Sequence, residues 1–241
     1  MVIFLKRLLT VVSAAVFFIC VFTLLFFIVY KTDSSVSTLS DTVNKTPSVV
    51  IDVGHGGEDG GAVAPDGTVE KDLNLSVALK LRDILNLYGV NIIMTRTEDI
   101  SIYSESAKDI RHKKISDIHN RFKIMQDNPD ALFVSVHQNK FSSPAQFGTQ
   151  VFYSKNTASS KRLAECIQKS VVKALQPENK RVVKPSGSEI YLLYNAKTTA
   201  VLVECGFISN KNELEKLKND SYQTQMAICI ADGIINYLQN G

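Results

Sequence analysis

Short β-branched runs alternate along this chain with longer segments that are apolar at every third or fourth position. The short runs predict buried strands, and the longer periodic segments predict amphipathic helices. This alternation favours an α/β fold, a single domain with a mainly parallel twisted sheet covered by helices on both faces. The expected elements are strand 49–53, helix 71–88, strand 91–95, helix 106–126, strand 132–136, strand 150–153, helix 158–175, strand 201–204, helix 211–218 and helix 221–238.

The amino-terminal segment 1–30 has a different pattern. Lys6 and Arg7 precede an uncharged, strongly apolar stretch that runs from 8 to 30. As a helix this stretch would be about 34 Å long, enough to cross a bilayer core of about 30 Å. The positive pair before it favours a cytoplasmic amino terminus and an exported remainder. We therefore expect a transmembrane signal-anchor that holds the exported protein at the outer face of the cytoplasmic membrane. The alternative is a cleaved signal and a secreted protein.

The segment 31–47 is polar and rich in Ser, Thr and Asp, which is typical of a linker. Residues 48–241 are long enough for one domain, and no further module is expected. The chain has 27 basic and 24 acidic residues and a formal net charge of +3, without a basic cluster. A nucleic-acid binder usually carries a basic patch, so nucleic acid is not an expected partner.

Chemically active side chains stand at the ends of three predicted strands. His55 follows the first strand in a glycine-rich loop, His137 ends a second, and Glu204, two positions before a glycine, ends a third. Because ligands bind at the carboxyl ends of parallel strands, these side chains are expected to converge in one crevice. Glu70 lies in the first turn of the helix that follows the glycine loop, where the helix dipole alone would also favour an acid.

Two histidines and a carboxylate describe a catalytic zinc site. Zinc would polarise a carbonyl and lower the pKa of a bound water to about 7, and Glu204 would be the general base. The spacing alone leaves open a surface turn that merely contains a histidine. His112 and His119 are interpreted as solvent-facing histidines of a helix. Cys205 has no activating base and is not expected to be a nucleophile.

Five motifs between Ser48 and Leu238 resemble the zinc-dependent N-acetylmuramoyl-L-alanine amidases of the type 3 catalytic family. They are the segments 52–62, 70, 95–96, 135–139 and 201–210. The resemblance implies that His55, Glu70 and His137 bind zinc and that Glu204 is the catalytic carboxylate. It also implies the reaction, hydrolysis of the amide between N-acetylmuramic acid and L-alanine in peptidoglycan.

Other positions that match the family are Arg96, Arg121 and Asn139, which are candidate substrate contacts. Arginine binds carboxylates through two parallel hydrogen bonds, although a structural ion pair beside the cleft would also explain the two arginines. Val53 stands where many members have proline, and Gln138 and Lys140 replace smaller residues. These departures bear on substrate preference and not on the proposed ligands.

A single catalytic domain on one membrane anchor, without a wall-binding module, is similar to the spore-cortex, or germination-specific, amidase of endospore-forming bacteria. The resemblance implies removal of stem peptides before muramic-δ-lactam formation, at the forespore or mother-cell membranes. The alternatives are a vegetative wall amidase, a zinc peptidase that cuts between amino acids, and a non-catalytic peptidoglycan-binding relative. An exported activating protein is an expected partner, because the linker would keep the domain near the membrane.

Overall fold

The computed structural model describes residue 23 and residues 46–240, which include the folded domain. The expected membrane segment, apart from residue 23, and nearly all of the linker lie outside the described residues. Among the residues that are described, no helix is long and apolar enough to span a bilayer. The membrane anchor therefore stays a prediction, and the domain from Thr46 onward forms a compact unit of its own.

The domain is built on one six-stranded sheet with the strand order β2-β1-β3-β6-β4-β5. Strands β2, β1, β3 and β6 are parallel to one another, whereas β4 runs antiparallel to β6 and pairs in parallel with β5. The sheet is therefore mixed, and the expected parallel arrangement holds for the part that carries the candidate site. The strands are β1 (Ser48–Val53), β2 (Asn91–Met94), β3 (Leu132–Asn139), β4 (Gln150–Tyr153), β5 (Lys184–Pro185) and β6 (Ala200–Phe207).

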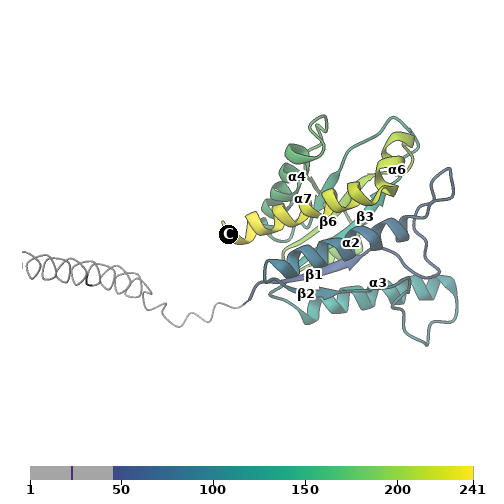
Figure 1. The fold of residues 1–241 in the computed structure, drawn as a ribbon. Helices are drawn as coiled ribbons and strands as arrows, with labels where there is room; N and C mark the ends of the chain where they lie inside the picture. The colour runs from purple at the N-terminus through teal and green to yellow at the C-terminus, as the bar shows by residue number, and fades with distance from the viewer. Residues whose placement is uncertain (1–22, 24–45, 241) are drawn as a thin grey trace, which may run out of the picture. The chain divides into compact units, whose positions relative to one another are not determined.

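Helices cover both faces of this sheet, as the sequence pattern predicts (Figure 1). One face packs against α2 (Glu70–Leu87), α4 (Ala158–Ala174) and α7 (Asp220–Gln239). The opposite face packs against α3 (Ile110–Asp127) and the short α5 (Tyr191–Asn195). Helix α6 (Lys211–Lys218) contacts α7 and the end of β6.

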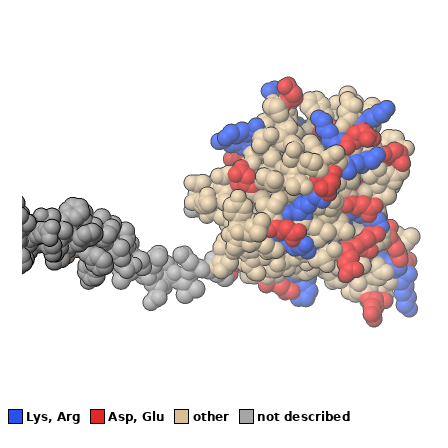
Figure 2. Space-filling view, in the orientation of Figure 1, with Lys and Arg blue, Asp and Glu red and all other residues tan. Residues whose placement is uncertain are grey.

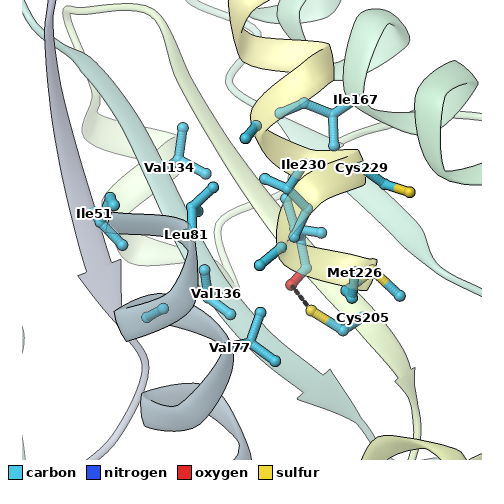
Figure 3. Close-up of a cluster of buried hydrophobic side chains, with 14 of the residues drawn as sticks. Ile51, Val77, Leu81, Val134, Val136, Ile167, Cys205, Met226, Cys229 and Ile230 are labelled. Atoms are coloured by element: carbon cyan, nitrogen blue, oxygen red, sulfur yellow. Dashed lines mark hydrogen bonds between the residues drawn. The ribbon is translucent and has the colours of Figure 1, made fainter. Parts of the chain in front are cut away.

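Successive side chains along each strand point to opposite faces of the sheet, and the core therefore consists of two clusters. Ile51 and Val134 face the larger cluster, where they meet Leu81 of α2 and Ile230 of α7 (Figure 3). The intervening strand residues face a smaller cluster under α3, built from Val50, Phe133, Leu202 and Met125. Because successive side chains of a strand point to opposite faces, both clusters form on the same strands.

Two strands are longer than the sequence pattern predicts, and this affects the site. Strand β3 extends to Asn139 and β6 extends to Phe207, so His137 and Glu204 lie within the sheet. They are direct register partners, and a register irregularity follows between His137 and Asn139. The two side chains therefore point from neighbouring strands toward the same face, near the carboxyl edge of the sheet.

Candidate metal centre and catalytic carboxylate

The three predicted ligands converge at the carboxyl edge of β1 and β3. His55 follows β1, His137 lies on β3, and Glu70 is the first residue of α2. One ligand atom from each lies within 4.8 Å of the others. Among the described residues, these three are the only group of histidine, cysteine or acidic side chains close enough together to hold a metal ion.

The Glu70 carboxylate lies between the two imidazole rings. Its Oε2 is 3.4 Å from His55 Nε2, and its Oε1 is 3.0 Å from His137 Nδ1. The two rings meet edge to face, with centroids 5.0 Å apart. Two imidazoles and one carboxylate that face a common point supply three protein ligands, which is the set that a catalytic zinc site uses.

Backbone amides fix the orientation of Glu70. The N–H of Ala62 donates to Oε2 at 2.9 Å, and the N–H of Gln138 donates to Oε1 at 3.1 Å. Asn74, one turn further along α2, donates to Oε1 at 3.4 Å. Burial favours a higher pKa for this carboxyl, but hydrogen bonds and charges from His137 and His55 hold its pKa well below the usual range. Glu70 is therefore ionised at neutral pH, as a metal ligand must be.

Asp59 orients the imidazole of His55. Its Oδ2 lies 2.8 Å from His55 Nδ1, which leaves Nε2 facing Glu70. Burial alone would lower the pKa of His55, but hydrogen bonds to Asp59 and Glu70, and their charges, raise it to about 9. A carboxylate behind a ligating histidine is a common way to fix its tautomer and ring orientation in metal sites.

The ligand side chains occupy space that is free only because Gly54 and Gly61 have no Cβ. A Cβ at Gly54 would overlap the ring of His137. A Cβ at Gly61 would lie 2.6 Å from both Glu70 Oε2 and His55 Cδ2, and Gly61 also has a φ of +70°. The donor set, the fixed orientations and this space fit a zinc ion bound by His55, Glu70 and His137.

Glu204 lies beside the ligands without joining the group. It is the register partner of His137, and its Oε2 is shielded from solvent with no hydrogen-bond partner among the described residues. Burial raises the pKa of this carboxyl to about 7. A carboxyl with a pKa near neutrality can both accept and return a proton, which is what a general base and acid requires.

The neighbouring Cys205 is not part of the site. It is buried among core residues on the other side of β6, with its Sγ 4.0 Å from the carbonyl of Val203 (Figure 3). Burial raises the pKa of this thiol to about 12, which opposes a role as nucleophile. His112 and His119 are exposed on α3, as expected, and are not in the ligand group.

Arg96 and Arg121 contact the loop that joins β1 to α2 and carries His55, and each arginine is 3% exposed. Their guanidinium groups bond to backbone carbonyls, and Arg121 also pairs with Asp52. This geometry favours the structural alternative over contact with substrate carboxylates. Asn139 is partly exposed at the end of β3, and its contact with substrate stays a prediction.

Sequence reasoning did not assign the supporting roles of Asp59, Asn74 and Gln138. Two of them carry a recognisable signal. Asp59 follows His55 by four residues and Asn74 follows Glu70 by four, and on a helix the latter spacing places both side chains on one face. Gln138 contributes through its backbone N–H, which no side-chain pattern reveals.

Comparisons with known proteins identify the family of this chain. Residues 49–236 match the family described as N-acetylmuramoyl-L-alanine amidase, amidase type 3. The germination-specific N-acetylmuramoyl-L-alanine amidase of Bacillus subtilis (strain 168) is 34% identical over 189 residues, 78% of this chain and 78% of that protein.

Two solved structures are similar over the same domain. The CwlD amidase from Clostridioides difficile, in complex with the GerS lipoprotein, has a TM-score of 0.78 and 39% identity, covering 81% of this chain and 100% of the other. AmiC2 of Nostoc punctiforme has a TM-score of 0.69 and 30% identity, covering 80% and 98%. Since the family match spans nearly the whole described domain, the chain belongs to the N-acetylmuramoyl-L-alanine amidases and is an enzyme of that class.

Proposed function

We propose that this amidase depends on zinc, which His55, Glu70 and His137 would hold, and that Glu204 is its general base and acid. The observation that carries the proposal is the convergence of three ligand atoms within 4.8 Å, next to the register partner of His137. Zinc in such a site acts as a Lewis acid that polarises a carbonyl and makes water more acidic.

The chain's own contribution to the reaction is the movement of one proton. Water adds to the carbonyl carbon of the lactyl–alanine amide while Glu204 accepts its proton. Glu204 then returns that proton to the alanine nitrogen as the C–N bond breaks, leaving a lactyl carboxyl group and a free alanine amine. The pKa of about 7 for Glu204 suits both halves of this transfer at neutral pH.

The proposed location is the outer face of a membrane, with the apolar stretch 8–30 as anchor and 31–47 as linker. As a flexible coil, a linker of this length spans about 20–25 Å on average, which would keep the site close to the membrane surface. The positive pair before the anchor supports this orientation. If the segment is cleaved, the same domain would be secreted.

The proposed biological role is removal of stem peptides from the spore cortex. Its support is the similarity to a relative named as germination-specific and to a CwlD amidase solved with a lipoprotein. The lipoprotein bound in that second structure also supports an exported protein as a partner of this chain. A vegetative wall substrate is the alternative role.

The reaction is tested by digesting purified peptidoglycan with residues 31–241, with and without added zinc, and identifying the products by mass spectrometry. We expect peptide-free muramic acid and new alanine amino termini, formed only when zinc is present. Cleavage between amino acids would indicate a peptidase, and the absence of any product from folded, zinc-loaded protein would indicate a non-catalytic relative.

The cortex role needs a separate test in a spore former that lacks its own cortex amidase. We expect expression of this chain to restore muramic-δ-lactam to the cortex. If lactam stays absent although the protein releases alanine-terminated peptides from vegetative wall, the vegetative alternative is correct.

A further inference from the structure

Three consecutive backbone carbonyls at the end of β1 are held by two buried guanidinium groups. Arg121 donates from Nη1 to the carbonyl of Val53 at 2.6 Å and from Nη2 to the carbonyl of His55 at 2.8 Å. Arg96 donates from Nε to Val53 at 3.1 Å and from Nη2 to Gly54 at 3.0 Å. The two arginines thus fix the path of the chain into and through His55.

That path includes an unusual backbone conformation. His55 has a φ of +60°, and it is the non-glycine residue with a positive φ among those that the structure describes. A residue with a Cβ rarely adopts this left-handed backbone conformation, because its Cβ crowds the neighbouring backbone atoms. Such a conformation persists where the surroundings impose it. The bond from Arg121 to the carbonyl of His55 itself is one such constraint.

The arginines are in turn fixed from several elements. Arg121 lies between Asp52 of β1 at 2.7 Å and Asp117 of α3 at 2.5 Å. Asp52 also accepts from Ser135 of β3 at 2.5 Å and from Thr95 at 3.1 Å.

All three guanidinium nitrogens of Arg96 also donate hydrogen bonds within the protein. Besides the two loop carbonyls, it donates to the carbonyls of Lys71 at 2.9 Å and Glu98 at 2.9 Å. Each guanidinium nitrogen of both arginines is therefore engaged within the protein. These groups hold the loop and are not available to a substrate.

We propose that Arg96 and Arg121 are positioning residues that set the zinc affinity of the site, because they hold His55 in the left-handed conformation that directs its ring toward Glu70 and His137. This inference rests on the proposed function, in which His55 is a zinc ligand. A purely structural ion pair would contribute to folding without changing the zinc affinity of molecules that are already folded.

The test measures zinc affinity of the full-length protein in detergent, stripped of metal and titrated against a competing chromophoric chelator. The temperature is kept below the unfolding transition of every variant. We expect Arg121→Gln and Arg96→Lys each to weaken zinc binding by about 10–100-fold, the effect typical of residues that support metal ligands. Arg111→Gln is the matched control, since Arg111 is an exposed arginine on the same helix as Arg121, and its affinity should equal that of the wild type.

A second control separates positioning from stability. Ile230→Val removes one methylene from the core of α7, far from the loop in sequence, and should lower the unfolding temperature with no change in zinc affinity. Hydrogen exchange of the amides of residues 54–59 should become faster in the arginine variants and stay unchanged in Ile230→Val.

The outcomes are distinct. If folded Arg121→Gln and Arg96→Lys bind zinc as tightly as the wild type, the arginines are only structural and the inference is wrong. If Arg121→Gln does not fold, Arg96→Lys, which keeps the buried charge, decides alone. If the wild type itself binds no zinc, the proposed function fails and this inference fails with it.

Discussion

At the scale of single residues, Glu204 and Cys205 are adjacent in the chain but have opposite surroundings. Glu204 is the register partner of His137, whereas Cys205 is buried in the core beneath α7. The reason is the alternation of side chains along β6, which turns one toward the site and the other into the helix layer. Both groups have raised pKa values through burial, about 7 for Glu204 and about 12 for Cys205. Only the former lies in a range useful for proton transfer at neutral pH.

The first prediction concerns this pair. Glu204→Ala should keep its zinc and lose about 10²–10⁴-fold in turnover, because general acid–base catalysis typically contributes that much. Cys205→Ala, at the next position, should keep both zinc and turnover. Metal analysis together with the rate of alanine release checks both variants. Loss of zinc from Glu204→Ala would mean that Glu204 is a ligand and not a base.

The second prediction concerns a glycine at the site. Gly54→Ala should displace the ring of His137, since the added Cβ would overlap it, and should therefore weaken zinc binding and activity together. Gly89→Asn is the control: nothing lies within 4 Å of a Cβ there, and asparagine tolerates the φ of +73°. Zinc titration of both proteins is the measurement. Wild-type affinity in Gly54→Ala would show that the ring can move without cost.

At the scale of elements, periodicity was sufficient for the long helices and the buried strands, and it was weakest for short or capped segments. Helix α3 begins at Ile110 and not at 106, because Asp109 caps it and accepts the N–H of His112 at 2.9 Å. The two-residue strand β5 and the five-residue helix α5 are too short for a periodic pattern. Their formation depends on tertiary contacts, which a single sequence does not display.

The candidate site, too, could be predicted from the sequence only in part. His55, Glu70, His137 and Glu204 could be assigned to one crevice because strand ends are visible in the sequence and parallel strands end at one edge. The roles of Arg96 and Arg121 could not, since their bonds join residues more than 40 positions apart. Hydrogen bonds to backbone carbonyls of a distant loop leave no pattern in the spacing of side chains.

The third prediction belongs to α3. Asp109→Ala removes the N-cap of this helix and should lower the free energy of unfolding by about 1 kcal/mol. Asp109 is exposed and lies outside the ligand group, so zinc binding should not change. Urea denaturation with Glu105→Ala, an exposed acidic residue of the preceding segment, as control is the appropriate measurement. Equal stability of the two variants would show that the cap contributes nothing.

For the molecule as a whole, the charge balance gives no simple electrostatic preference for a partner. On the face shown in Figure 2, acidic and basic side chains are interspersed over the domain. The chain as a whole carries 27 basic and 24 acidic residues. We therefore expect recognition of peptidoglycan to depend on the crevice at the carboxyl edge of the sheet and on any partner held at the same membrane, more than on the net charge of the domain.

The metal content of the purified protein is the decisive test of the proposed zinc site. We predict one zinc ion per wild-type molecule, most of it lost in His137→Ala, because that variant leaves only His55 and Glu70 as ligands from the group of three. His119→Ala removes an exposed histidine of α3 and should retain the full zinc content. A folded His137→Ala protein with undiminished zinc would contradict the account, since the metal would then be bound elsewhere.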